Sequence, residues 1–170
     1  GLFMSVLKKP GHLVSDVSCR ASARKGKTKP PKDSDKAAGL LKNPDEYAIS
    51  AVGDVLSAVP EVIAPLLARL PKKVRVVASG VEIGMTRGKD FIPSPELGLS
   101  MAYNRGVMPE VEVDEATALN YLRRQPLILQ PEVPKGMVLI TYRGLPLGWV
   151  KNIGSRANNL YPKELGIKFL

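Results

Sequence analysis

Residues 10–45 constrain the fold most, because this stretch combines positive charge with small polar residues and offers little that could form a core. It follows an apolar run at residues 1–9, which has the composition of a short buried strand. A strand buried on both faces needs neighbours, and the next segment supplies none. We therefore expect residues 1–9 to be the last strand of a domain that lies outside this chain, and residues 10–45 to be a flexible basic linker. The basic residues at the centre of the linker are Arg20, Arg24, Lys25, Lys27, Lys29 and Lys32.

The remaining sequence predicts an α+β fold in two small mixed modules, at residues 46–110 and 111–170. Hydrophobic residues make up 44% of the chain, which is enough for a core. Its 15 prolines are nearly twice the average share, and this favours turns and short elements over a helical bundle.

The first module is expected to alternate short strands with two helices. A helix over residues 61–70 would bury the face that carries Ile63, Leu66, Leu67 and Leu70. Ser94 is placed to cap a second helix that starts at Pro95. The expected inward residues of that helix are Leu97, Met101 and Ala102. Strands are expected at residues 47–50, 54–59, 74–78 and 81–84.

The second module is expected to hold one helix and a hairpin. Asp114 is placed to cap a helix over residues 115–124, with Ala118, Leu119 and Leu122 on its core face. An Arg143-Gly144 turn is expected to join the two hairpin strands, and Trp149 to anchor the hairpin in the core. Strands are expected at residues 111–113, 137–142 and 145–152, and an irregular loop at residues 154–162.

Positive charge is concentrated at the two ends of the chain, whose formal net charge is +9. Residues 1–45 hold 10 Lys and Arg against 4 Asp and Glu, and residues 136–170 hold 5 against 1. Residues 46–135 are nearly neutral, with 10 against 11. This distribution favours contact between a polyanion and the two ends, although a basic tail is equally consistent with a solvated linker.

Cations and hydrogen-bonding side chains are dense in residues 144–163, where the hairpin leads into a loop. Lysine and arginine there would bind phosphates, and asparagine amides suit base edges, the ribose 2′-OH or the turns of the loop itself. A tyrosine ring is suited to stacking on an unpaired base. The candidate RNA-binding residues are Arg143, Lys151, Asn152, Arg156, Asn158, Asn159, Tyr161 and Lys163. By themselves, the amides also fit local turn chemistry and the cations ordinary surface charge.

The same segment resembles a known family. Residues 144–149 read Gly-Leu-Pro-Leu-Gly-Trp, and residues 151–163 read Lys-Asn-Ile-Gly-Ser-Arg-Ala-Asn-Asn-Leu-Tyr-Pro-Lys. Together they closely resemble the C-terminal signature of the Nop/Sun family of bacterial rRNA (cytosine-5) methyltransferases. The similarity continues upstream, at residues 92–101 and 113–123, and residues 1–8 resemble the last strand of the family's catalytic domain.

The resemblance implies a Rossmann-type methyltransferase domain, then a small α/β domain at residues 46–110, then a PUA-like RNA-binding domain at residues 111–170, built as a β-rich barrel or sheet with short helices. It also implies a mechanism in which a cysteine thiolate adds to C6 of cytosine, so that C5 accepts a methyl group from S-adenosylmethionine. A second cysteine helps to release the product.

The catalytic part of that machinery is not recognisable in this chain. The family's nucleophile stands beside a proline, whereas the lone Cys19 lies between Ser18 and Arg20, and no glycine-rich loop opens a helix after a strand. A single cysteine and the single His12 also leave no internal disulfide and no cluster of metal ligands. We therefore expect no catalytic residues, cofactor or metal here, and a chain that is inactive by itself.

The resulting hypothesis is a cytoplasmic RNA-binding part of an rRNA methyltransferase. Its expected partners are rRNA, of the small subunit, and the catalytic domain of the full-length protein, with no membrane contact. Two alternatives stay open: a protein-interaction or ribosome-assembly module that docks an acidic partner, and a free-standing enzyme that uses Cys19.

Overall fold

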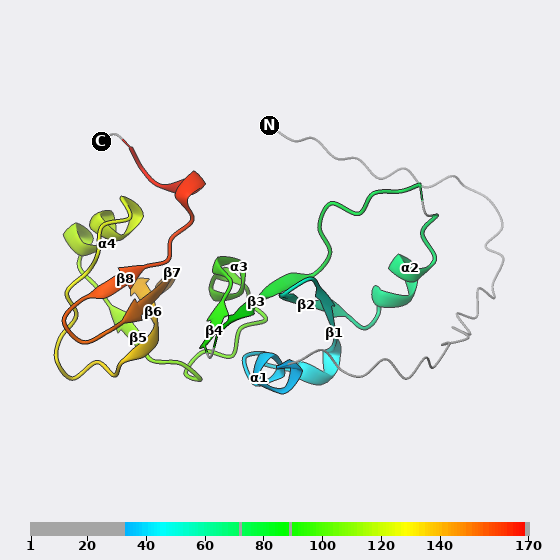
Figure 1. Ribbon diagram of the computed structural model, residues 1–170, viewed down its shortest axis with the longest axis horizontal. Coiled ribbons are helices and arrows are strands. Elements are labelled where there is room, and N and C mark those ends of the chain that lie inside the picture. The colour runs from blue at the N-terminus through cyan, green and yellow to red at the C-terminus, as the bar shows by residue number, and fades with distance from the viewer. Residues whose placement is uncertain (1–32, 72, 89, 169–170) are drawn as a thin grey trace.

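The computed structural model describes residues 33–71, 73–88 and 90–168, and it has the predicted α+β architecture. Two four-stranded sheets lie side by side, with helix α3 (Pro95–Leu99) between them and helix α4 (Glu115–Leu122) on the far side of the second sheet (Figure 1). The expected strand at residues 1–9 and most of the expected linker at residues 10–45 lie outside the described residues. Among the described residues, no helix is long and apolar enough to cross a membrane.

The first sheet is an antiparallel meander in the order β1-β2-β3-β4. Gly53 adopts a φ of 62° in the turn between the first two strands, a conformation that favours glycine. A bulge between Leu56 and Ser57 shifts the register of the next pair of strands. The strands are β1 Tyr47–Val52, β2 Val55–Pro60, β3 Val81–Arg87 and β4 Asp90–Pro93. Three of the four strands expected in this module are therefore confirmed, with somewhat different ends.

The segment between β2 and β3 differs from the prediction. The helix expected over residues 61–70 is only the five-residue α2, Ala64–Ala68, with Pro65 in its first turn. Its expected core face is largely exposed, since Leu66 is 54% exposed and Leu70 41%. Residues 74–78 form no strand. The apolar spacing is compatible with a buried helix. The face stays exposed because, in the described part of the chain, no other element packs against it.

Part of the expected linker belongs to the core. Helix α1, Ser34–Ala38, is followed by the 3-10 helix η1, Pro44–Glu46. Ala37, Leu40 and Leu41 are almost completely buried. The Asn104 amide donates to the Leu40 carbonyl, so this short apolar stretch is held by residues far along the chain. The prediction of a flexible linker is therefore wrong for residues 33–45. The short apolar run in this basic segment packs against residues that are distant along the chain.

Helix α3, Pro95–Leu99, connects the two sheets. The Ser94 hydroxyl caps it as predicted, accepting from the Leu97 amide at 3.1 Å. Leu97 and Ala102 are buried as expected, whereas Met101 is 96% exposed, because the helix ends before it and the chain turns it outward.

Trp149 is the anchor that the sequence predicted. Its indole is 1% exposed, and Nε1 donates to the Ser94 carbonyl at 2.8 Å. Its ring meets Tyr103 edge to face, with centroids 5.3 Å apart. A Cβ on Gly98 would lie 3.0 Å from the indole nitrogen, so the missing side chain lets α3 approach the second sheet closely.

The second sheet has the order β5-β6-β7-β8 and is open, so the sheet alternative for this module is correct and the barrel alternative is not. The turn between β6 and β7 has positive φ at both Arg143 and Gly144, as the prediction of a two-residue hairpin requires. The strands are β5 Glu110–Glu112, β6 Gly136–Tyr142, β7 Leu145–Asn152 and β8 Ala157–Asn159. The short strand β8 lies where an irregular loop was expected, and β5 pairs with β6 in parallel.

Both faces of the second sheet are covered. One face packs its Leu139 and Trp149 side chains against α3 and the first sheet. The other packs Val138, Ile140 and Val150 around Tyr121 of α4, Glu115–Leu122. Asp114 caps α4 as predicted, and the 3-10 helix η2, Lys163–Leu165, follows β8. The helix ends two residues earlier than expected, before Arg124 adopts a φ of 62°.

Candidate nucleic-acid interface

The alternation of side chains along β7 and β8 divides the predicted RNA-binding residues between two faces. In an antiparallel pair, residues opposite each other project to the same side of the sheet. Asn152 is paired with Ala157, and Val150 with Asn159, on the side that faces α4. Lys151 is paired with Asn158 on the other side. The two faces give their residues different environments.

Asn152 and Asn159 are held by the fold. The Asn152 amide nitrogen donates to the carbonyls of Val133 and Pro134, and its oxygen accepts from the Gly154 amide at 2.9 Å. Asn159 donates to the carbonyls of Tyr121 and Gln125, at 2.8 and 2.9 Å, and its oxygen accepts from the Tyr161 amide. Turn chemistry, the alternative left open by the sequence, therefore accounts for both amides.

Lys151 and Asn158 stay accessible on the opposite face. Lys151 Nζ lies 2.5 Å from Asp90 Oδ2 of β4, and both side chains are substantially exposed, at 40% and 56%. Such an exposed pair is weak and can exchange partners. Among the described residues, the Asn158 side chain has no hydrogen-bond partner and is half-buried.

Arg156 and Lys163 are exposed, and neither forms an ion pair with any residue in the described ranges. Arg156 precedes β8, and Lys163 begins η2. Tyr161 lies between them in sequence and is half-buried, with its ring 5.4 Å from that of Tyr121. Burial raises the pKa of the Tyr121 phenol, and the neighbouring Tyr161 adds to this.

Arg143 lies at the opposite end of the sheet from the other candidate cations. Strand β7 has 8 residues, so its two ends are roughly 20–25 Å apart at the usual rise of a strand. The Arg143 guanidinium carbon lies 5.1 Å from the centre of the Tyr142 ring, beside a turn whose Gly144 amide donates to Glu112. The structure therefore does not join Arg143 to the other cations.

Two acidic side chains, Glu110 and Glu112, lie near the end of the sheet that carries Arg143. Glu110 accepts hydrogen bonds from Arg105, which hold the pKa of its carboxyl below the usual value. Glu112 accepts from the Thr141 hydroxyl at 2.6 Å, and this bond is the main reason that its pKa is also lowered. Both groups thus stay ionised near β5, and this negative charge makes the β5 side of the sheet unsuited to phosphate.

Two cations beside β8 were not predicted from the sequence. Arg124 Nε donates to the Tyr161 carbonyl at 2.9 Å, which places this side chain against the segment that leads to Lys163. The Lys135 side chain lies over the β7–β8 turn, where a Cβ on Gly154 would meet its Cε at 2.8 Å. Only the tertiary fold brings them here, so no local pattern of the sequence could have revealed them.

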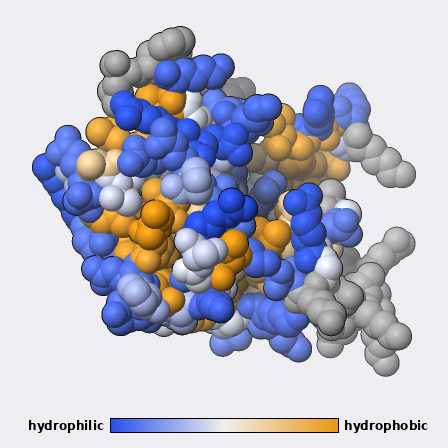
Figure 2. Space-filling view, turned by 60° about the vertical axis from the view of Figure 1, so that its left-hand side comes forward, coloured by the Kyte–Doolittle hydropathy of each residue, from blue (hydrophilic) through white to orange (hydrophobic). Residues whose placement is uncertain are grey.

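We call this region the basic edge and define it by five cations along β8 and the segments next to it. Within the described chain, Lys151 is the only one of the five with a carboxylate partner, Asp90. The members are Arg124, Lys135, Lys151, Arg156 and Lys163. Figure 2, turned to bring the second sheet forward, shows a mainly hydrophilic surface with separate hydrophobic spots.

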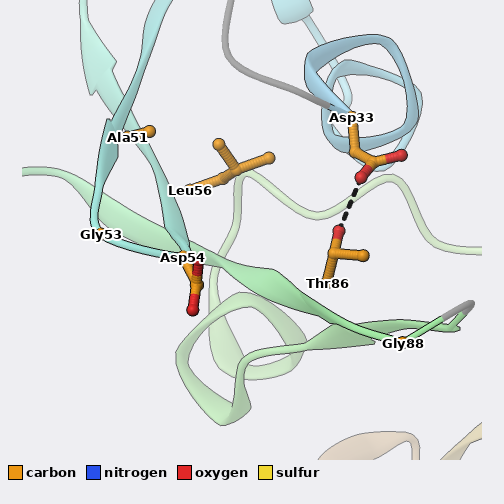
Figure 3. A pocket seen from close by; sticks show the side chains of 7 residues that line it. All are labelled: Asp33, Ala51, Gly53, Asp54, Leu56, Thr86 and Gly88. Carbon is orange, nitrogen blue, oxygen red and sulfur yellow. Dashed lines mark hydrogen bonds between the residues drawn. The ribbon is translucent and has the colours of Figure 1, made fainter.

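A pocket of about 290 Å³ on the first sheet has a different character (Figure 3). Asp33 and Asp54 line it, and the Thr86 hydroxyl donates to Asp33 at 2.7 Å. The described lining holds these two carboxylates and no cation, and Lys36 pairs with Asp33 at 2.7 Å beside it, so the pocket is not built for an anionic ligand. Across the residues that the structure describes, no group of three or more His, Cys, Asp or Glu side chains is arranged to hold a metal ion.

Comparison with known proteins defines the class of the second module. Residues 108–167 match the family model described as the methyltransferase RsmF PUA domain. This range contains the whole second sheet, α4 and all five residues of the basic edge. The C-terminal module is thus a PUA-like domain of the kind found in RsmF-type methyltransferases.

Three curated relatives share one name with each other, ribosomal RNA small subunit methyltransferase F. The chain is 32% identical over 94 residues to ribosomal RNA small subunit methyltransferase F of Shewanella loihica, covering 55% of this chain and 19% of the relative. The proteins of the same name from Aeromonas salmonicida and Erwinia tasmaniensis are 27% and 28% identical, over 59% and 62% of this chain and 21% of each relative. The resemblance to the Nop/Sun family is thereby confirmed, and the chain spans about a fifth of the length of these relatives.

Proposed function

We propose that this chain is the RNA-binding part of an S-adenosylmethionine-dependent rRNA cytosine-5 methyltransferase, and that its basic edge holds ribosomal RNA of the small subunit. The observation that carries the proposal is that five cations lie along β8 and the segments next to it in a PUA-like domain, and that four of them have no carboxylate partner in the described chain. Phosphate contacts made by lysine and arginine supply most of the affinity of non-specific nucleic-acid binding.

Catalysis would belong to a domain outside this chain. The lone Cys19 lies outside the described residues, and the relatives are about five times as long as the region they share with this chain. That domain would bind S-adenosylmethionine and supply the two cysteines of the family's mechanism, and the full protein would act in the cytoplasm. The present chain would contribute affinity and position the target cytosine.

Filter binding to small-subunit rRNA fragments tests the assignment of the site. We expect Arg156→Ala with Lys163→Ala to weaken binding by about tenfold at low salt, because two phosphate contacts are lost. Arg143→Ala is the matched control, since it also removes an exposed cation from the same module but lies in the acidic end. Equal losses in the two proteins would contradict the assignment.

A basic edge also fits an acidic protein partner, so the second candidate function is a protein-interaction or ribosome-assembly module. A pull-down with and without nuclease separates the two functions. Under the proposal, nuclease releases the partners of the chain together with the RNA. Partners that stay bound after complete digestion, and are released by added salt, would favour the interaction module.

A further inference from the structure

The β7–β8 turn presents a row of exposed side chains in which apolar residues and cations alternate. Ala157 and Leu127 exchange two backbone hydrogen bonds, of 2.7 and 3.1 Å, and form an isolated antiparallel bridge at β8. The next residues along, Ile128 and Arg156, therefore face each other on the opposite side from the buried Leu127 and Ala157.

The row continues across the turn. The Ile153 amide donates to the Arg156 carbonyl at 2.9 Å, so these two residues are also neighbours. Beyond them lies Lys135, whose side chain covers Gly154. The order across the surface is thus Ile128, Arg156, Ile153 and Lys135, which we call the terminal row.

The exposure of the two isoleucines is unusual for their position. Ile128 is 87% exposed and Ile153 42%, whereas Val138, Ile140 and Val150 of the neighbouring strands are completely buried. Helix α3 covers this face of the sheet around Trp149 and does not reach the terminal row, because β7 continues three residues beyond Trp149 before the turn. The apolar surface is therefore open and is flanked by positive charge on both sides of Ile153.

Such a surface matches one class of ligand. Unpaired bases offer flat apolar faces that pack on hydrophobic side chains and stack on arginine guanidinium planes, and the phosphates between them need cations. A duplex hides its base faces, and an acidic protein offers none. Asn158 lies on the same face two residues beyond Arg156, where its free amide can reach a base edge.

We infer that the terminal row binds single-stranded RNA. Bases lie on Ile128, on Ile153 and on the plane of the Arg156 guanidinium, whose N–H groups also donate to a phosphate, and further phosphates lie on Lys135 and Lys151. The inference rests on the proposed function and adds to it the structural class of the RNA: the chain binds unpaired nucleotides in preference to duplex.

The test is fluorescence anisotropy of the full chain with a labelled 20-nucleotide mixed-sequence RNA, alone or annealed to its complement. Charge alone would favour the duplex, because it carries the higher charge density. The inference predicts the reverse order, with the single strand bound at least about threefold more tightly. Ile128→Ser with Ile153→Ser should weaken single-strand binding by about three- to tenfold and leave the salt slope unchanged, because no phosphate contact is lost.

Leu145→Ser is the matched control, because Leu145 is also an exposed apolar residue of this module, at 68%, but it begins β7 at the acidic end of the sheet. Single-strand affinity should be unchanged in this variant. Circular dichroism checks folding, and the single variant Ile128→Ser, at the more exposed position, serves if the double variant unfolds. Duplex bound as tightly as single strand, or isoleucine variants with full affinity, would overturn the inference while leaving RNA binding intact. Failure of the unchanged chain to bind either RNA at low salt would overturn the proposed function as well.

Discussion

Asn158 and Asn159 are adjacent in β8 and have opposite environments. The Asn159 amide makes three hydrogen bonds that tie β8 to the end of α4 and to Tyr161. Asn158 faces away from α4, beside Lys151. The same residue type therefore serves the fold at one position and is open to a ligand at the next, and the period of two along a strand is the whole reason.

Because of this contrast, we expect a substitution at Asn159 to affect the stability of the fold and one at Asn158 to affect RNA binding. Asn159→Ala should lower the free energy of unfolding by about 1–3 kcal/mol, because two carbonyls and one amide lose a partner. Asn158→Ala should leave the free energy of unfolding within about 0.5 kcal/mol and weaken RNA binding. Urea denaturation and anisotropy on both proteins provide the measurement. A stability loss in the Asn158 variant as large as that in the Asn159 variant would contradict the assigned faces.

Asp90 is predicted to limit RNA affinity through Lys151. Asp90→Asn removes a negative charge and the 2.5 Å ion pair, so Lys151 becomes available to phosphate. We expect the affinity for RNA to rise by about two- to fivefold at low salt, and the gain to shrink as salt screens the charge. Anisotropy at two salt concentrations measures this. An affinity that is unchanged or lower at low salt would show that Lys151 does not contact the RNA.

At the scale of elements, both helix caps were predictable, because a cap is a local device. Ser94 and Asp114 each accept a hydrogen bond from the amide three residues on. The Arg143-Gly144 turn was predictable for the same reason. The segment at residues 61–80 was not, because apolar spacing cannot tell whether another layer covers a helix. Strand β8 was also missed, since a three-residue strand has too little pattern to distinguish it from a loop.

The cap of α4 should make stability depend on pH. Its hydrogen bonds to Thr117 lower the pKa of Asp114 from its ordinary value of 3.8. Because the folded pKa is the lower one, the stabilising contribution is fully present above pH 3.8 and is lost as the pH falls through the folded value. Asp114→Ala should therefore lower the urea midpoint clearly at pH 7 and much less in strong acid. Asp114→Asn, which keeps a capping side chain, should stay close to the unchanged protein at pH 7. A difference between the alanine variant and the unchanged protein that does not vary with pH would contradict this account.

At the scale of the whole molecule, the two sheets share a core through Trp149 and α3. One cluster of buried residues contains Leu41 of the expected linker, Ile83 of the first sheet and Trp149 of the second. The sequence correctly predicted the α+β architecture and the anchoring tryptophan. It missed the role of Leu40 and Leu41, and it missed Arg124 and Lys135 at the basic edge, because these contacts join residues that are distant along the chain.

This shared core predicts that the two sheets unfold together. Trp149→Ala should lower the free energy of unfolding by about 3–5 kcal/mol, since it leaves a large cavity between the sheets. It should also loosen the first sheet, which Trp149 reaches through the Ser94 carbonyl. Hydrogen exchange of amides in β3 is the sensitive measurement. Protection of β3 that is unaffected in the variant would mean that the sheets are energetically independent.

The central claim is that the basic edge binds RNA through phosphates, and a salt series tests it most directly. Binding of the full chain to small-subunit rRNA fragments should weaken steeply with salt. In a Lys151→Ala, Arg156→Ala, Lys163→Ala variant, the slope of log affinity against log salt should be shallower by about 2, because three phosphate contacts are lost. Unchanged affinity and an unchanged slope in this variant would contradict the account.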